Sequence, residues 1–329
     1  EKEQKKVDFF AINSCILFAY TSITMSLNNL RIISLLPAAT EIIAALGLVE
    51  RLVGRSHECD EPTSVQDLPA LTKPRINASG SSLDIHQQVE HVQDSLFSLD
   101  VKQLVDLKPD LILTQATCDV CAVSENEVRK TIADSQLHTH ILTLSPTTLN
   151  GVFKDILSVG QAIDKEHKAR DVVSHLKKRC DEIPSRLNDI SMAPRVAVIE
   201  WLDPPMAAGN WIPEMVSLAG GLDVLGNSGS HSHWITWDDI VNANPDIVVL
   251  APCGFELNRV IEEAHTPIIR QQLQQIPAVR EGQAWAVDGH HLFNRPGPRL
   301  VDSLELLAEI LHPQIFQFSL ADQFARLLR

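Results

Sequence analysis

Residues 31–47 read RIISLLPAATEIIAALG, and this segment predicts one strand followed directly by one helix. The first apolar run has the length and composition of a buried strand, and Pro37 marks the turn after it. Apolar side chains then recur at helical spacing until Gly47, a residue type that commonly ends helices. A strand-then-helix unit of this kind is typical of α/β proteins with parallel sheets.

The rest of the first half continues the same alternation of strands and helices. Short apolar runs predict strands at 52–54, 111–113 and 141–144. A helix is expected from Ser124 through 132, because Ser124 and Glu127 have the spacing of a capping box. We interpret these elements as one α/β lobe.

The second half repeats this plan. RVAVIEW at 195–201 corresponds to the strand at 31–34, and NPDIVVL at 244–250 corresponds to KPDLIL at 108–113. A further strand at 284–287 and a helix at 299–311 complete the second set. Such internal similarity predicts two Rossmann-like β/α lobes with a ligand cleft between them.

The two halves are joined by a segment that predicts helix. No proline occurs between Pro146 and Pro184, and apolar residues recur three or four apart, with an interruption at Asp164-Lys165. A rigid helix of this length reaches from one lobe to the other. We divide the chain into a leader or non-native extension (1–30), an N-terminal lobe (31–147), a linking helix region (148–190), a C-terminal lobe (191–318) and a frayed tail (319–329).

Charge and composition limit the classes of partner and the cellular locations that the chain can have. The chain has 42 acidic and 28 basic residues and a net charge of −14, which repels nucleic acid. Six cysteines are too few for a disulfide scaffold in 329 residues. The apolar stretch at 9–23 is too short to span a membrane, so no membrane span is expected. We expect a monomer, cytoplasmic if translation starts at Met25 and exported or periplasmic if the first residues are a secretory leader.

Unusual side chains gather after the predicted strands. Ligands of parallel α/β sheets bind at the carboxyl ends of the strands, so these loops from two lobes predict a polar and aromatic cleft. Tryptophans there are interpreted either as core or as flat walls for a ring-shaped ligand. The candidate ligand-binding residues are Pro37, His57, Glu58, Cys59, Asp60, Cys118, Cys121, Trp201, Asp203, Asn210, Trp211, Cys253, Phe255, Phe293, Asn294 and Arg295.

The cysteines leave alternatives open. Cys118 and Cys121 form a single C-x-x-C pair, whereas a structural zinc site needs further ligands. His57, Cys59, Cys253 and the pair His290-His291 could complete a zinc or other metal site in space. A thioredoxin-like role for the C-x-x-C pair is a further interpretation.

The arrangement of these motifs resembles a known family. RIISLLPAATEIIAALG, LKPDLIL, the linking helix, WLDPPMAAGNWIPEMVSLAGG and FNRPGPR at 293–299 are similar to class III solute-binding proteins of ABC importers. The resemblance covers about 31–312 and is to the vitamin B12 branch and its relatives for iron-siderophores and haem. It implies cobalamin as the ligand between the lobes, an ABC permease as a partner, and limited closure because the linking helix is stiff.

The sequence therefore predicts non-enzymatic binding of a corrinoid-like metal chelate in the cleft between the lobes. Two alternatives remain at this point. One is a metal- or thiol-dependent enzyme that uses His57, Glu58, Cys118, Cys121 and Cys253. The other is a binding protein for an iron-siderophore or haem.

Overall fold

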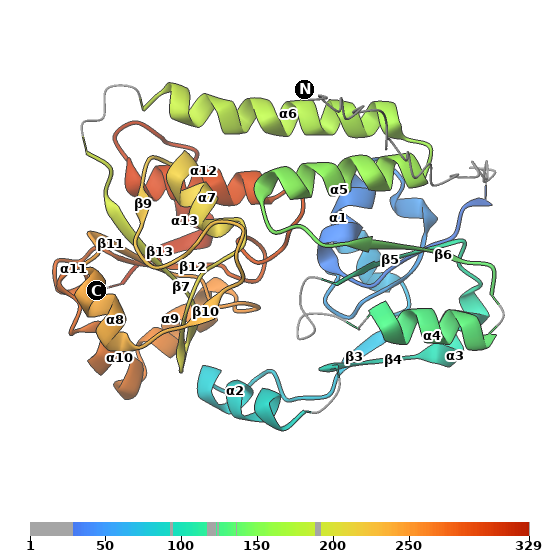
Figure 1. The fold of residues 1–329 in the computed structure, drawn as a ribbon, viewed down its shortest axis with the longest axis horizontal. Helices are drawn as coiled ribbons and strands as arrows, with labels where there is room; N and C mark the ends of the chain where they lie inside the picture. Colours follow the sequence, from blue (N-terminus) through green and yellow to red (C-terminus); the bar gives the residue numbers. More distant parts are fainter. Residues whose placement is uncertain are drawn as a thin grey trace, which may run out of the picture.

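The computed structural model describes residues 29–92, 95–116, 123, 125–135, 137–187 and 192–328. Within these ranges, two α/β lobes lie side by side and two helices run along one edge of the molecule (Figure 1). The predicted α/β fold of two lobes with a helical connection is confirmed. Cys118, Cys121, the cap residue Ser124 and the expected leader up to residue 28 lie outside the described residues.

The N-terminal lobe is built around a parallel sheet. Its strands are β1 (Ile32–Ser34), β2 (Leu52–Arg55), β5 (Leu111–Gln115) and β6 (His140–Leu144), in the order β2-β1-β5-β6, and β3 (Thr72–Pro74) pairs separately with β4 (Phe97–Leu99). Its helices are α1 (Pro37–Ala45), α2 (Ser82–His91), α3 (Val101–Leu107) and α4 (Glu125–Ser135), with short 3-10 helices η2 (Val49–Arg51) and η3 (Thr63–Asp67). Every residue of β1 is buried, as its apolar sequence predicts.

The C-terminal lobe has a mixed sheet. Its strands are β7 (Arg195–Leu202), β8 (Pro205–Ala207), β9 (Leu222–Asp223), β10 (His233–Trp234), β11 (Ile247–Leu250), β12 (Ala284–Val287) and β13 (Ala325–Leu327). The order is β10-β8-β7-β11-β12-β13, with β9 also paired with β7, and β7, β11 and β12 are parallel. Its helices are α7 (Ile212–Leu218), α8 (Trp237–Ala243), α9 (Leu257–Ala264), α10 (Pro267–Leu273), α11 (Pro277–Arg280), α12 (Leu300–Leu311) and α13 (Ala321–Phe324).

The repeated K/N-P-D motif has the same local structure in both lobes. The residue before the proline ends a helix in the left-handed conformation, with φ of 44° in one copy and 45° in the other. Asp110 Oδ2 then accepts a hydrogen bond of 2.8 Å from the backbone N–H of Arg31, and Asp246 Oδ2 accepts one of 2.8 Å from Arg195. The same side chain thus fixes the start of the neighbouring strand in each lobe, which supports the interpretation of two copies of one plan.

The connection consists of two helices, α5 (Leu149–Ala162) and α6 (Glu166–Ser185), which pack against each other. The interruption expected at Asp164-Lys165 is confirmed, because Asp164 has a φ of 54° between the two helices. Arg179 of α6 pairs with Asp302 and Glu305 of α12, while α5 packs on α1. One helix of the pair therefore rests on each lobe.

The N-terminal lobe also contacts the other lobe through α2. Ser81 caps this helix in a capping box with Asp84, and Ile85 packs into the hydrophobic core of the C-terminal lobe. The backbone N–H and the hydroxyl of Ser82 donate to Glu263 Oε1 at 2.8 and 2.6 Å. This helix lies opposite α6 in Figure 1, so the lobes are bridged on two sides.

The chain end differs from the prediction of a frayed tail at 319–329. Residues 325–327 form β13, which pairs antiparallel with β12, and the side chains of Ala325 and Leu328 are buried. Pairing with an otherwise unpaired sheet edge satisfies backbone groups that a frayed tail would leave to water. Among the described residues, no helix has the length and apolar character needed to cross a membrane. The other domain limits stay predictions.

One buried carboxylate gives the fold a testable pH dependence. Burial raises the pKa of Asp155 in α5 to about 6, and its Oδ2 has no hydrogen-bond partner among the described residues. Because the folded-state pKa is the higher one, the neutral form stabilises the fold at low pH, and this contribution is lost as the pH rises from about 4 through 6. We expect Asp155→Asn to raise the free energy of unfolding by about 1–2 kcal/mol at pH 7.5, allowing for partial solvation, and by almost nothing at pH 4.

Urea unfolding at the two pH values measures this difference. Asp134→Asn on the exposed face of α4 is the matched control, and it should change neither value. An equal effect of Asp155→Asn at both pH values would contradict the assignment.

Candidate ligand-binding cleft

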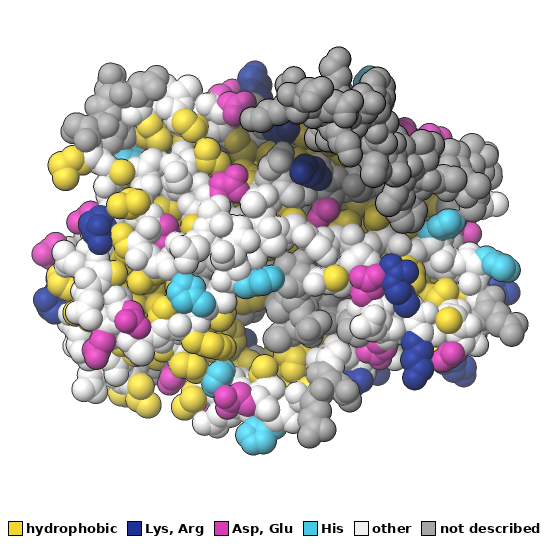
Figure 2. Space-filling model, viewed as in Figure 1, with side chains coloured by type: hydrophobic (Ala, Val, Ile, Leu, Met, Phe, Trp, Pro, Cys, Tyr) yellow, Lys and Arg dark blue, Asp and Glu magenta, His cyan; other side chains and the backbone are white. Residues whose placement is uncertain are grey.

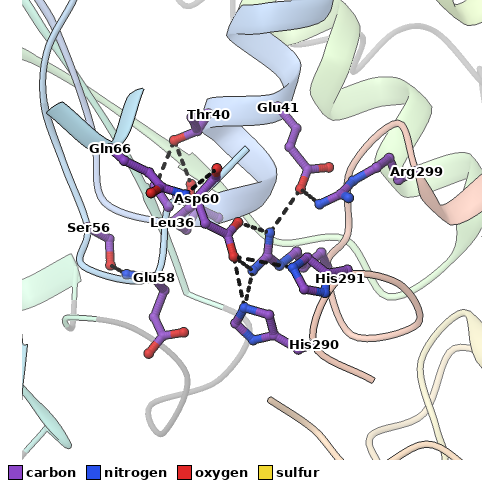
Figure 3. Close-up of polar contacts among 12 residues, drawn as sticks. Leu36, Thr40, Glu41, Ser56, Glu58, Asp60, Gln66, His290, His291 and Arg299 are labelled. Carbon is purple, nitrogen blue, oxygen red and sulfur yellow. Dashed lines mark hydrogen bonds and ion pairs between the residues drawn. The ribbon is translucent and has the colours of Figure 1, made fainter. Parts of the chain in front are cut away.

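The loops that follow the parallel strands meet between the lobes. The carboxyl end of β2 leads to Asp60, and the carboxyl end of β12 leads to His290 and Arg295. Figure 3 shows Asp60 and His290 pointing toward one another from opposite lobes. Figure 2 shows the molecular face hollowed between the two lobes, above α2. The predicted cleft position at the strand ends is the position where the lobes approach each other.

An ion pair across this boundary is the central contact. Arg295, whose side chain is 6% exposed, donates from Nη1 to Asp60 Oδ1 at 2.6 Å and from Nη2 to Asp60 Oδ2 at 3.0 Å. Arg295 Nη1 also lies 3.3 Å from Glu41 Oε1, and Arg299 Nη2 donates to the same oxygen at 2.6 Å. Two carboxylates of the N-terminal lobe are therefore neutralised by two guanidinium groups of the C-terminal lobe.

Two histidines extend this cluster. His290 Nε2 lies 2.9 Å from Asp60 Oδ2 and 2.8 Å from Arg295 Nη2. Since a guanidinium N–H can only donate, His290 Nε2 cannot donate to Asp60 while it accepts from Arg295. Asp288 orients His291, because its Oδ2 lies 3.0 Å from His291 Nδ1 and its Oδ1 accepts the backbone N–H groups of both histidines.

The electrostatics follow from these partners. Burial alone would raise the pKa of Asp60, but its interactions with His290 and Arg295 outweigh burial and hold that pKa below its ordinary value. The hydrogen bond to Asp288 raises the pKa of His291. Asp60 is therefore a carboxylate at neutral pH, which is what a bidentate guanidinium pair requires.

A second polar group follows β2 at its carboxyl end. Thr72 Oγ1 lies 2.6 Å from His57 Nδ1, and His57 Nε2 lies 3.1 Å from Glu58 Oε1. The hydrogen bond to His57 lowers the pKa of Glu58, so this partly exposed carboxylate is charged at neutral pH. His57 and Glu58 thus present polar atoms beside the central ion pair.

Four of the predicted ligand-binding residues are buried inside the lobes. Cys59 is 1% exposed, Thr40 Oγ1 donates to its sulfur at 3.0 Å, and burial raises its pKa to about 11. Trp211 is 6% exposed and donates from Nε1 to Phe293 O at 2.7 Å. Phe255 and Phe293 are fully buried. Between the two interpretations of the tryptophans, Trp211 has the surroundings of a core residue.

The remaining candidates in the described residues are partly exposed. Trp201 donates from Nε1 to Ser82 O at 3.2 Å and packs edge-on against Phe255, so it supports the contact with α2. Asn294 Nδ2 donates to two backbone carbonyls. The other partly exposed candidates are Pro37, Asp203, Asn210 and Cys253.

Some residues of the cleft were missed by the sequence prediction. Glu41 and Arg299 belong to the central cluster. Glu41 is an acid in α1, whose other residues apart from Thr40 are apolar, and this contrast was the signal available in the sequence. Glu200 at the end of β7 is a further case. Burial raises its pKa, while its Oε2 accepts a hydrogen bond of 2.6 Å from Ser232 Oγ.

Comparison with known proteins agrees with this architecture. Residues 32–289 match the profile of a family described as periplasmic binding protein. The chain belongs to that family. The family and the relatives described below are named as binding proteins, which supports the predicted binding role over the metal- or thiol-dependent enzyme considered from the sequence. The resemblance inferred from the sequence motifs is confirmed.

Three similar proteins illustrate the range of the family. An uncharacterized ABC transporter substrate-binding lipoprotein of Bacillus subtilis, YvrC, is 25% identical over 303 residues, which is 90% of this chain and 84% of YvrC. The vitamin B12-binding protein of Vibrio cholerae is 24% identical over 284 residues, covering 85% and 88% of the two chains. The crystal structure of the periplasmic heme-binding protein HutB of Vibrio cholerae has a TM-score of 0.65 at 17% identity, covering 87% of this chain and all of that one.

The buried position of Trp211 leads to a stability prediction. Trp211→Ala removes a large side chain from the core and leaves the carbonyl of Phe293 without its donor, so we expect a loss of about 3–5 kcal/mol in the free energy of unfolding. Trp234→Ala is the matched control, because Trp234 is 54% exposed and its loss should cost under about 1 kcal/mol. Chemical denaturation of both variants measures the difference, and equal effects would contradict a core role for Trp211.

Proposed function

We propose that this protein binds a corrinoid in the cleft between its lobes and delivers it to an ABC permease. The support is the family, together with a B12-binding relative that matches over most of its length. The observation that carries the proposal is the meeting of strand-end loops from both lobes at Asp60 and Arg295. A ligand held there would contact both lobes at once, as a flat ring with polar groups around its edge requires.

The partly exposed polar side chains of the cleft suit such a ligand. Corrinoids carry amide groups around the ring, and amide N–H groups are donors to carboxylates. Glu58 is charged and accessible, and His57 beside it is held by Thr72. We propose as the ligand contacts the buried Arg295 at the boundary of the lobes together with the partly exposed set Pro37, His57, Glu58, Asp60, Trp201, Asp203, Asn210, Cys253 and Asn294, and the other buried candidates as their support.

A titration tests the ligand. The purified protein is titrated with cyano-, hydroxo- and adenosyl-cobalamin while tryptophan fluorescence and corrin absorbance are followed together. We expect saturable quenching with one ligand per chain and a dissociation constant of about 1 μM or lower. A parallel titration with haemin follows its Soret band, because a haem-binding protein shares the fold. Saturation by haemin alone would transfer the assignment to haem, and no response to either would refute it.

A substitution tests the place of binding. Glu58→Ala should weaken cobalamin binding about tenfold or more, because a hydrogen bond to a charged acceptor contributes about 1.5–3 kcal/mol. Glu50→Ala is the matched control, since Glu50 precedes β2 at the opposite end of the same strand and is exposed. Equal affinities of the two variants would place the ligand elsewhere.

The transport part of the proposal rests on the similarity to YvrC, a substrate-binding lipoprotein of an ABC transporter. It implies that the native protein is exported or anchored outside the cytoplasmic membrane. Fractionation of cells that express the complete gene tests this, and recovery of the protein in the cytoplasmic fraction alone would oppose it.

A further inference from the structure

Three side chains at the boundary of the lobes have the geometry of a metal site. Asp60 comes from the N-terminal lobe, and His290 and His291 come from the C-terminal lobe. One potential ligand atom from each lies within 4.8 Å of the others. Asp60 Oδ2 is 2.9 Å from His290 Nε2 and 3.7 Å from His291 Nε2. These separations bracket the distance of about 3.3 Å between donor atoms of a tetrahedral zinc ion with bonds of about 2.0–2.2 Å.

A second observation points to metal binding, namely the orientation of His291. Its Nδ1 is held 3.0 Å from Asp288 Oδ2, and a carboxylate can only accept, so Nδ1 carries the proton. Nε2 of the neutral ring is then free to donate a lone pair on the side of Asp60. A carboxylate behind a histidine is the usual outer contact of histidine ligands, which it orients and makes more basic.

The charge of the cluster also favours a cation. At least four carboxylates and two guanidinium groups interact here, which leaves an excess of about two negative charges with neutral histidines. The carboxylates are Glu41, Glu58, Asp60 and Asp288, and the guanidinium groups are Arg295 and Arg299. A divalent ion would balance this excess in a partly buried site.

Arg295 competes with such an ion for part of the site. Its Nη2 lies 3.0 Å from Asp60 Oδ2 and 2.8 Å from His290 Nε2, the two atoms that would ligate the metal. Its Nη1 contacts the other oxygen, Asp60 Oδ1, at 2.6 Å, and this bond can persist while Oδ2 binds an ion. Metal binding therefore requires Nη2 to move away from these two atoms, and Arg295 then remains a hydrogen-bond donor to a ligating carboxylate, a common outer contact.

We propose that Asp60, His290 and His291 bind one Zn²⁺ ion that links the two lobes. Two imidazoles and one carboxylate suit zinc, whereas magnesium and calcium prefer oxygen ligands alone. Three protein ligands leave a fourth tetrahedral position for water or for a donor atom of a ligand in the cleft. Because the ligands come from both lobes, the ion fixes the lobes relative to each other.

Zinc titration of the full chain tests the site. Protein freed of metal by a chelator is titrated with Zn²⁺ alone by calorimetry and with Co²⁺ alone by visible absorption. We expect one ion per chain and the bands of a four-coordinate Co²⁺ without a thiolate charge-transfer band. His291→Ala should weaken binding more than about 100-fold, and Asp288→Asn should weaken it about 10–100-fold while leaving the three ligands in place.

Two controls separate this site from other histidines and thiols. His265→Ala alters an exposed histidine of the same lobe and should bind Zn²⁺ like the parent chain. A Cys118→Ser, Cys121→Ser variant should also retain the ion. Circular dichroism shows whether each variant is folded. If His291→Ala does not fold, Asp288→Asn alone carries the test.

The proposal is overturned by any of three results: no stoichiometric Zn²⁺ binding, binding unchanged in both His291→Ala and Asp288→Asn, or binding lost only with the two cysteines. All measurements are made without cobalamin, so the zinc site and the corrinoid proposal can fail separately.

Discussion

The bidentate pair between Arg295 and Asp60 is the contact on which the arrangement of the two lobes depends. Each partner lies in a loop that follows the carboxyl end of a parallel strand, and each finds its opposite charge in the other lobe. Removing two charges from water is costly unless they are paired with good geometry, and here both oxygens of Asp60 receive a donor. Glu41 and Arg299 add a second ion pair, again between an acid of the N-terminal lobe and a guanidinium group of the C-terminal lobe. Within the described part of the chain, the ion pairs of Glu41, Asp60, Arg295 and Arg299 all cross the boundary and thus align the lobes.

Hydrophobic packing acts together with this polar contact. One continuous core cluster includes side chains of β1 and α1, of both linking helices, and of β7, α7 and α12. On the opposite side, α2 inserts Ile85 into the core of the C-terminal lobe and hydrogen-bonds the buried Glu263. Independent movement of the lobes would expose apolar surface on one side and leave Glu263 without its donors on the other. The predicted limited closure has a physical basis in both contacts.

The sequence predicted the elements better than the contacts between them. Strands at β1, β5, β11 and β12, the repeated K/N-P-D motif and the break at Asp164 follow from local patterns of two, three or four residues, and these were confirmed. By contrast, nothing local distinguishes Trp211 as a buried side chain from Trp234 as an exposed one, because the difference depends on Phe293, which is 82 residues away. The crossing of α2 and the pairing of β13 likewise depend on partners distant in sequence. Cys59 looked like a cleft residue because it lies between Glu58 and Asp60, but its side chain turns inward to Thr40.

These constraints bear on how a ligand reaches the cleft. Opening the lobes widely would break the Asp60 pair and undock α2 together, and each event removes the partners of a buried polar group, Arg295 in the first case and Glu263 in the second. Small displacements of α2 cost less than wide opening of the lobes. Its contact with the C-terminal lobe is confined to a few side chains. Movement of α2 is therefore the less costly way to widen the opening between the lobes, while the Arg295 pair and the linking helices keep the strand ends in place. Under the proposed function, selectivity among flat chelates therefore follows from the fixed positions of the polar side chains at the strand ends rather than from closure around the ligand.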